Sequence, residues 1–170
     1  SAPGKRTPSD AKLTDLLYLC QSSAAVGADF SGTFQQIRDR FLEIERELGV
    51  TANMASHLDT LKKQLEEGVT KDHVASRGEY LNGLIMAAYL GAEFVDPQDC
   101  VVLTANGGVD PSTWELLGKR LADASKRYVV PGFYGRDAKG RVKTFSRGGS
   151  DISGAIVARA GKAEVYENWT

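Results

Sequence analysis

The chain has 170 residues, 42% of them hydrophobic, which is enough to build the core of one domain or slightly more than one. Its 21 lysine and arginine residues nearly balance 22 aspartate and glutamate residues, so the formal charge of -1 offers no basic stripe for nucleic acid. No apolar run approaches the roughly 18 residues of a membrane span, and Cys20 and Cys100 lack metal-ligand spacing. We expect a globular, cytoplasmic protein with no metal site and no nucleic-acid or membrane partner.

Helices are predicted for most of the first 90 residues. Apolar residues recur at helical spacing over 33–48, and Gly49 supplies a C-terminal stop. A shorter helix carries three leucines on one face and ends at Gly68. Thr70 can then cap a long helix that runs through Tyr89. The second half of this helix is apolar nearly all round, so we expect it to be buried.

Strands and helices alternate in the remainder of the chain. The predicted elements are strands at 92–96 and 100–104, a helix at 111–126, a strand at 127–135 that breaks at Pro131, a hairpin tip at 136–141 returning through 142–145, a helix at 150–161 and a last strand at 163–169. Interleaved strands and helices are typical of α/β domains. The fold class predicted is therefore a three-layer α/β/α sandwich around a mainly parallel sheet.

The stretch "KTFSRGGSD" at 143–151 combines an arginine, hydroxyl groups and two glycines just before a predicted helix. Backbone N–H groups at a helix start bind anions, glycines allow a ligand to approach, and Arg147 offers a planar fork for a carboxylate or phosphate. A plainer interpretation stays open, because Ser150 and Asp151 are also ordinary N-cap residues. On residue types alone, short glycine-rich motifs are weak evidence for function.

Four separated motifs give this chain a resemblance that spans nearly its whole length. The segment 129–170, with "GFYG", "TFSRGGSD" and a final "WT", resembles the aspartokinase branch of the amino-acid kinase family. In the same order as in that family, "SAPGKR" (1–6) is similar to its Ser-Ala loop, "TDLL" (14–17) to a helix start, and "ASRGEYLNGLIMAAYL" (75–90) to its Gly-Glu helix. Four motifs in order are far more specific than one glycine-rich loop.

The resemblance implies transfer of a phosphoryl group from ATP, with Mg²⁺, to the side-chain carboxylate of L-aspartate, giving 4-phospho-L-aspartate. By similarity, Arg147 clamps a substrate carboxylate and Glu79 takes the amino group. The other substrate-binding residues implied by the resemblance are Ser1, Thr14, Phe133, Gly148 and Ser150. Gly149, Ser150 and Asp151 are implied at the phosphoryl-transfer centre, and Thr170 at the nucleotide.

Plainer roles remain open for several of these residues. A glutamate that follows glycine on a helix is usually a surface residue, and Thr14 could be only a helix N-cap. Phe133 could belong to the core at a strand end, and for Tyr134 we prefer that interpretation. The two histidines are expected at helix surfaces and the two cysteines in the interior.

The family pattern also contains segments that these 170 residues do not show. It opens with a strand and a Lys-Phe-Gly-Gly loop that holds the transferring phosphate, and it continues with a nucleotide-binding half and regulatory ACT domains. We therefore interpret residues 1–170 as a partial catalytic domain, truncated at both ends, that is inactive alone and belongs to a homo-oligomer when full-length. Two alternatives remain: a kinase of glutamate, N-acetylglutamate or carbamate, and a non-catalytic amino-acid-binding module.

Overall fold

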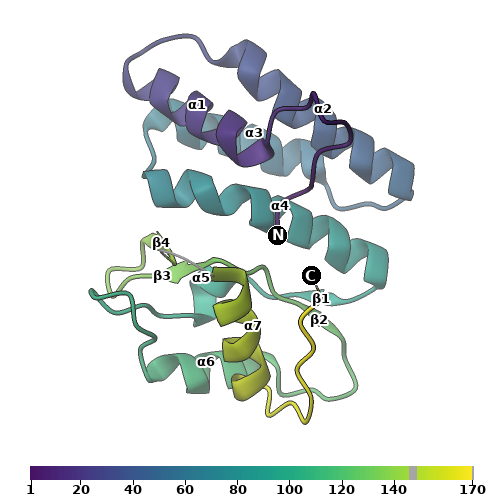
Figure 1. Ribbon diagram of the computed structural model, residues 1–170, viewed down its shortest axis with the longest axis vertical. Helices are drawn as coiled ribbons and strands as arrows, with labels where there is room; N and C mark the ends of the chain where they lie inside the picture. The colour runs from purple at the N-terminus through teal and green to yellow at the C-terminus, as the bar shows by residue number, and fades with distance from the viewer. Residues whose placement is uncertain (146–148, 170) are drawn as a thin grey trace.

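The computed structural model describes residues 1–145 and 149–169. The elements, in chain order, are α1 (Leu13–Ala25), α2 (Ser31–Leu48), α3 (Met54–Glu67), α4 (Lys71–Leu90), β1 (Glu93–Phe94), α5 (Pro97–Cys100), α6 (Ser112–Arg120), β2 (Tyr128–Val129), β3 (Tyr134–Arg136), β4 (Val142–Thr144) and α7 (Gly149–Ala160). Figure 1 shows α1 to α4 stacked at one end, the strands across the middle, and α6 and α7 at the other end.

Helices α1 to α4 form one layer around a core of leucine, isoleucine and phenylalanine side chains. The predicted helix ends are confirmed: Gly49 ends α2 with a left-handed φ of 63°, and Thr70 Oγ1 accepts a hydrogen bond from the backbone N–H of His73 at 3.2 Å. Nine of the 20 residues of α4 are buried. The predicted burial of its second half is confirmed only in part: Leu81 and Ile85 are buried, whereas Tyr89 and Leu90 at its end are exposed. No helix in the described part of the chain combines the length and the apolar character that crossing a membrane requires.

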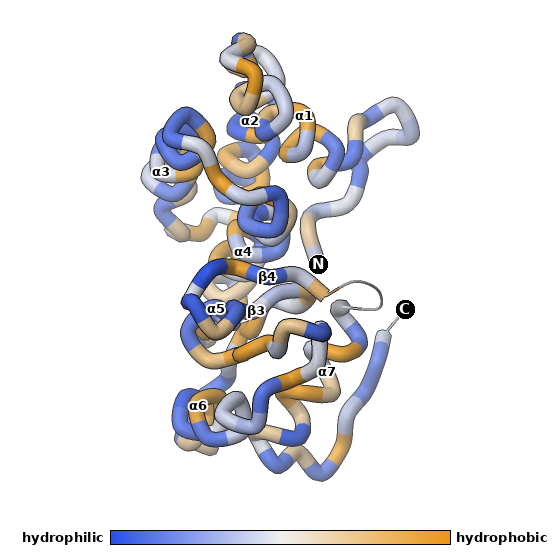
Figure 2. The backbone as a smooth tube through the Cα atoms, turned by 90° about the vertical axis from the view of Figure 1, so that its left-hand side faces the viewer, coloured by the Kyte–Doolittle hydropathy of each residue, from blue (hydrophilic) through white to orange (hydrophobic). Residues whose placement is uncertain are grey.

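The strands form two separate pairs. β1 and β2 are parallel, with Glu93 opposite Tyr128, whereas β3 and β4 form the predicted antiparallel hairpin, with Tyr134 opposite Thr144. Figure 2 shows this hairpin directly beneath α4, and α6 and α7 pack below it around a second hydrophobic core. The order of layers is thus helix, strand, helix.

Of the predicted mainly parallel sheet, the described residues show one parallel pair of strands. The described residues contain only two two-stranded sheets, one parallel and one antiparallel. The strand predicted at 100–104 is wrong, because Asp96 caps and Pro97 opens the short helix α5, after which the chain makes isolated bridges at Val102 and Leu103. The expected last strand at 163–169 is exposed and unpaired within the described residues, so its backbone has no ladder to join.

The helix predicted over 111–126 ends earlier, at Arg120. The side chain of Asp123 accepts hydrogen bonds from both the backbone N–H and the hydroxyl group of Ser125, at 3.0 and 2.6 Å. Such a local turn competes with the helical backbone pattern. The chain therefore leaves the helix before the polar run that follows Leu121.

A buried cation joins α4 to the hairpin. The guanidinium of Arg77, a residue only 7% exposed, lies 4.4 Å from the ring centre of Tyr80 and 5.5 Å from that of Tyr134. Tyr134 is itself buried, as predicted, and its hydroxyl donates a hydrogen bond to Asp96 at 2.9 Å. Burial, with nearby Asp96, raises the pKa of Tyr134 above its ordinary value, so this hydroxyl stays a donor. These contacts fix the strand that follows Phe133.

The prediction that both histidines lie at helix surfaces is wrong, because both are half-buried. His73 Nε2 lies 2.9 Å from Gln64 Oε1, and burial together with the charge of Arg77 lowers the pKa of His73 to about 4. The two cysteines are buried as predicted, and burial raises the pKa of each thiol to about 11.

His73 is expected to make the protein less stable in acid. Its pKa is about 4 when folded and about 6.5 when unfolded, so the unfolded state binds the extra proton between these values. The contribution of neutral His73 is full above pH 6.5 and is lost as the pH falls toward 4. In urea denaturation from pH 7.5 to 4.5, His73→Gln should therefore lose less free energy of unfolding than the wild type does. Equal losses of unfolding free energy in the two proteins would show that His73 does not have this lowered pKa.

Candidate functional site

A cavity of about 330 Å³ lies where α1, α4, the residue before β3 and the first turn of α7 meet. Its lining residues are Thr14, Ala75, Glu79, Phe133, Gly149, Ser150 and Asp151. All of these except Ala75 belong to the site implied by the sequence motifs. Ala75 was missed, although its place four residues before Glu79 puts both on one face of α4.

Glu79 brings a buried negative charge into this cavity. Its Oε2 atom is buried and has no hydrogen-bond partner among the described residues. Burial raises the pKa of this carboxyl group, although the backbone of Glu79 itself, the charge of the Ser1 amino group and the backbone of Ala2 partly oppose the rise. A buried carboxylate oxygen without a hydrogen-bond donor is costly when the group is ionised. The cavity is therefore suited to a ligand that presents a cationic group, such as an ammonium group, to Glu79.

Phe133 forms part of the wall in an unusual backbone conformation. Its φ is 81°, in the left-handed region that a side chain normally avoids. Two hydrogen bonds hold it there: its N–H donates to Ser153 Oγ at 2.9 Å, and its carbonyl accepts from the N–H of Phe145 at 2.9 Å. The half-buried ring is thus placed by its neighbours rather than by its own preference.

The first turn of α7 supplies the opposite rim. Gly149 is buried against Phe133, whereas Ser150 and Asp151 are exposed. Both lie inside α7, which begins at Gly149, and so neither is the N-cap that the plainer interpretation assigned. Asp151 Oδ1 accepts a hydrogen bond from Asn168 Nδ2 at 3.2 Å, which ties the rim to the chain that follows α7.

Thr14 and Ser1 approach the cavity differently. Thr14 lies in the first turn of α1 and lines the cavity; the N-cap position belongs to Lys12, so the predicted capping role of Thr14 is wrong. Ser1 lines a neighbouring groove together with Ser150, and its carbonyl accepts a hydrogen bond from Asn82 Nδ2 at 2.7 Å. The structure therefore brings Ser1 beside the cavity rather than into it.

Gly78 lets the segment beginning at Ser1 lie close to α4. A Cβ atom at position 78 would lie 2.8 Å from Cβ of Ala2, closer than two carbon atoms can approach. Gly78→Ala is expected to displace Ser1 and Ala2 and to cost about 1 kcal/mol of unfolding free energy, the overpacking cost exceeding the gain in helix propensity. Urea denaturation measures this loss. A stabilised variant would show that the segment moves away without cost.

Three predicted residues, Arg147, Gly148 and Thr170, lie outside the described residues, so their roles stay predictions. Within residues 1–145 and 149–169 no group of three or more His, Cys, Asp or Glu side chains could hold a metal ion.

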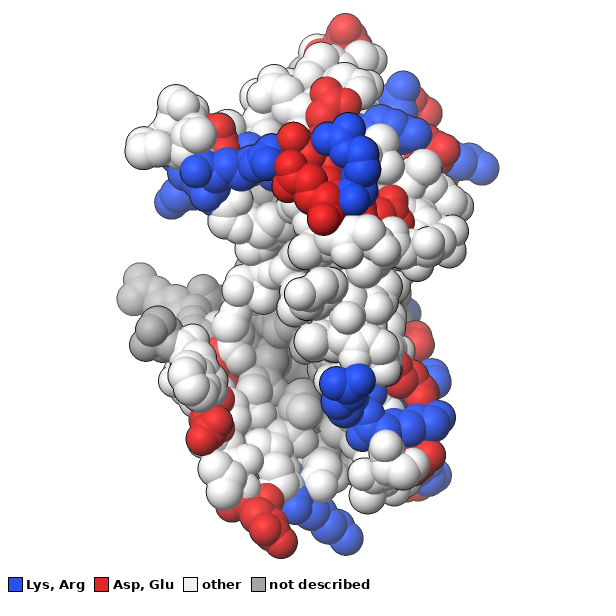
Figure 3. Space-filling view, turned by 90° about the vertical axis from the view of Figure 1, so that its right-hand side faces the viewer, with Lys and Arg blue, Asp and Glu red and all other residues white. Residues whose placement is uncertain are grey.

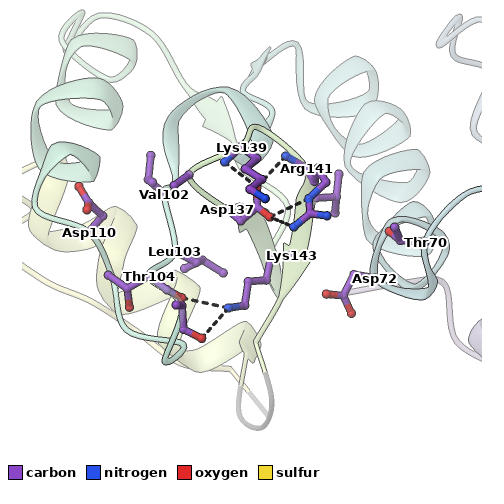
Figure 4. Close-up of a pocket in the computed structure, with 13 residues that line it drawn as sticks. Thr70, Asp72, Val102, Leu103, Thr104, Asp110, Asp137, Lys139, Arg141 and Lys143 are labelled. Atoms are coloured by element: carbon purple, nitrogen blue, oxygen red, sulfur yellow. Dashed lines mark hydrogen bonds and ion pairs between the residues drawn. The ribbon is translucent and has the colours of Figure 1, made fainter.

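A larger cavity of about 570 Å³ lies between the start of α4 and the hairpin, lined by none of the described residues predicted for the site. Figure 4 shows two of its cationic side chains, Lys143 and Arg141, bonded to neighbouring groups. Lys143 Nζ donates to the carbonyls of Thr104 and Ala105 at 2.9 and 3.1 Å, and Arg141 pairs with Asp137 at 2.8 Å. The smaller cavity, in which Glu79 Oε2 has no hydrogen-bond partner among the described residues, is the better candidate site.

On the face in Figure 3, charged side chains gather toward the two ends, and the waist between them is largely uncharged.

Comparison with known proteins agrees with these motifs. The chain is 33% identical to aspartokinase 3 of Bacillus subtilis, covering 100% of this chain and 40% of that protein. It superposes on the crystal structure of aspartate kinase from Clostridium acetobutylicum with a TM-score of 0.94 at 45% identity, over 100% of this chain and 39% of that one. The chain thus spans about 40% of the length of these relatives.

A more distant structure shares the fold. Aspartokinase III of E. coli, crystallised with aspartate and ADP, superposes with a TM-score of 0.71 at 22% identity, over 91% of this chain and 39% of that one. The sequence model described as "Amino acid kinase family" matches residues 26–170, most of the chain. With this match added to the motifs and to the cavity they line, the chain belongs to the amino acid kinase family.

Proposed function

We propose that the complete gene product containing this chain transfers a phosphoryl group from ATP to the side-chain carboxylate of L-aspartate. The product is 4-phospho-L-aspartate, from which lysine, threonine and methionine are made. One observation carries the proposal: four separate parts of the chain converge on one cavity, in which the buried Oε2 atom of Glu79 has no hydrogen-bond partner among the described residues. Its relatives named aspartokinase or aspartate kinase support the choice of substrate.

The proposed reaction forms one bond and breaks one. An oxygen of the aspartate side-chain carboxylate bonds to the γ-phosphorus of ATP, and the bond from that phosphorus to the bridging oxygen breaks, so that ADP leaves with both electrons. Such a reaction asks the protein mainly for positioning and for neutralisation of charge. ATP, with Mg²⁺, supplies the phosphoryl group.

The described residues serve the acceptor side of this reaction. Glu79 receives the ammonium group of aspartate, because its buried Oε2 atom has no hydrogen-bond donor among the described residues. Phe133 and Thr14 close the cavity around the substrate, and Ser150 and Asp151 lie on the exposed rim, where the phosphoryl group would arrive. By resemblance, Arg147 holds a substrate carboxylate and Thr170 contacts the nucleotide.

A steady-state assay of ADP release decides between this function and its alternatives. The complete gene product, given ATP and Mg²⁺, should turn over L-aspartate with a kcat/KM at least about a hundredfold above that for L-glutamate, N-acetylglutamate or carbamate, because a mismatched acceptor leaves buried polar groups unpaired. A preference for one of the other acceptors would indicate a different kinase of the family. Binding of L-aspartate without ADP release would indicate the non-catalytic module.

We also propose that a larger, mainly parallel sheet forms in the complete protein, with residues 1–170 as part of its catalytic domain. A groove of about 660 Å³ runs beside β2 and α7, and its apolar lining includes Tyr128, Val130 and Val157. Strands added there would continue the parallel β1–β2 pair between the two helical layers, as the three-layer sandwich requires. The homo-oligomer and the cytoplasmic location stay predictions.

A further inference from the structure

Ser153 bridges two parts of the cavity wall without lining the cavity itself. Its Oγ accepts a hydrogen bond from the backbone N–H of Phe133 at 2.9 Å and donates one to the carbonyl of Gly149 at 2.6 Å. Ser153 lines the groove on the other side of α7. One hydroxyl group therefore joins the residue before β3 to the first turn of α7.

Phe133, the residue before β3, depends on its neighbours to keep its backbone conformation. Phe133 adopts a left-handed backbone that is costly for any residue except glycine. Its ring and backbone also lie against Gly149, where a Cβ atom would come within 2.8 Å of Cδ2 and 3.0 Å of Cα of Phe133. Without the hydrogen bond from Ser153, the backbone of Phe133 can relax to an ordinary conformation. The Phe133 ring would then lose its contact with Gly149.

We propose that Ser153 is a positioning residue that keeps Phe133 in its left-handed conformation and couples it to the helix turn carrying Ser150 and Asp151. The consequence for catalysis rests on the function proposed above; the bridge itself does not. The aspartate pocket then keeps its shape before substrate arrives, so that binding does not have to order the wall. A serine that only bonds to its own helix would have no such effect.

Ser22 offers a matched control, because its hydroxyl donates to the carbonyl of Leu19 at 3.0 Å within α1 and makes no second hydrogen bond among the described residues. The conservative variant is Ser153→Thr, which keeps a hydroxyl able to make both bonds. Hydrogen exchange of the peptide containing residues 131–135, followed by mass spectrometry on the complete gene product, reads the bridge without any enzyme assay.

In that experiment Ser153→Ala should speed exchange of the Phe133 amide about tenfold, since the donor loses its acceptor. Ser153→Thr and Ser22→Ala should exchange like the wild type. If the Phe133 amide exchanges at the wild-type rate in Ser153→Ala, the Ser153 hydroxyl does not hold it. The same conclusion follows if Ser153→Thr exchanges as fast as Ser153→Ala.

Steady-state kinetics of the same variants tests whether Ser153 affects the binding of L-aspartate. Ser153→Ala should raise the KM for L-aspartate about tenfold and leave the KM for ATP within about twofold, and Ser153→Thr should restore the aspartate KM to within about threefold of wild type. Faster exchange with an unchanged aspartate KM, or with equal rises for both substrates, overturns the positioning role. If the wild type does not phosphorylate aspartate, the proposed function is refuted instead. Hydrogen exchange then still shows whether Ser153 holds the backbone of Phe133.

Discussion

Glu79→Gln is expected to raise the KM for L-aspartate of the complete gene product by at least about thirtyfold while changing the KM for ATP by less than about threefold. The buried Oε2 atom has no partner in the described structure, so the substrate ammonium is its natural counter-ion. Removing one charge of a desolvated pair costs roughly 2 to 5 kcal/mol. Steady-state kinetics with each substrate varied in turn measures this effect.

The matched control is Glu66→Gln, which neutralises an exposed glutamate on α3. It should leave both KM values unchanged. If Glu79→Gln weakened ATP as much as aspartate, or if Glu66→Gln had the same effect, the assignment of Glu79 to the amino group would be wrong.

In the absence of substrate, Glu79→Gln should stabilise the protein. Burial raises the pKa of Glu79, so between its ordinary and its raised value the folded state binds more protons, and stability falls as the pH rises. At pH 7 the wild type therefore bears the cost of an ionised carboxylate whose buried Oε2 atom has no hydrogen-bond partner among the described residues. Glu79→Gln should gain about 1 kcal/mol of unfolding free energy at pH 7, and this gain should vanish below the ordinary pKa of glutamate. A loss of stability at pH 7 would mean that Glu79 has a structural partner.

Gly149→Ala is expected to damage both stability and the pocket. A Cβ atom at this position would lie 2.8 Å from Cδ2 and 3.0 Å from Cα of Phe133, and 3.1 Å from Cβ of Phe145, so backbone has to move. The cost is about 2 kcal/mol, more than the gain in helix propensity that alanine brings. The aspartate KM should rise as well, because Phe133 lines the cavity.

Gly32 provides the comparison for this variant. It lies near the start of α2, is exposed, and has no atom within 4 Å of an added Cβ. Gly32→Ala should therefore stabilise the protein by about 0.5 to 1 kcal/mol through backbone entropy. Urea denaturation of the two variants side by side separates crowding from propensity; equal effects would contradict the packing assigned to Gly149.

The helices were largely predictable because their signals are local. The apolar spacing before Gly49, the cap at Thr70 and the apolar run of α4 each depend on residues within a few turns. The hairpin from β3 to β4 was predictable for the same reason, since its tip carries a glycine with a φ of 79° at Gly140.

The strands were harder because a strand needs a partner that the local sequence does not name. Residues 163–169 form an apolar, strand-like run in the sequence, yet they are unpaired within the described residues. At 100–104 the neighbouring cap at Asp96 and Pro97 turned part of the run into a helix. Pairing is a long-range property, and periodicity does not report it.

Motif resemblance found the cavity residues, but it did not find how they are supported. Nothing in the sequence indicates that Phe133 has a positive φ, because most phenylalanines do not, or that Ser153 faces its N–H group. The buried atom of Glu79 likewise became evident only once α4 was placed against the segment at Ala2. Such contacts join residues remote in sequence, and they appear only in three dimensions.

A crystal structure of the complete gene product with L-aspartate would show whether this cavity binds the substrate. We expect aspartate in the cavity lined by Thr14, Glu79, Phe133 and Ser150, with its ammonium nitrogen within about 3.2 Å of Glu79 Oε2. Its side-chain carboxylate should face the first turn of α7. Aspartate bound elsewhere, or bound here with its ammonium group turned away from Glu79, would contradict this expectation.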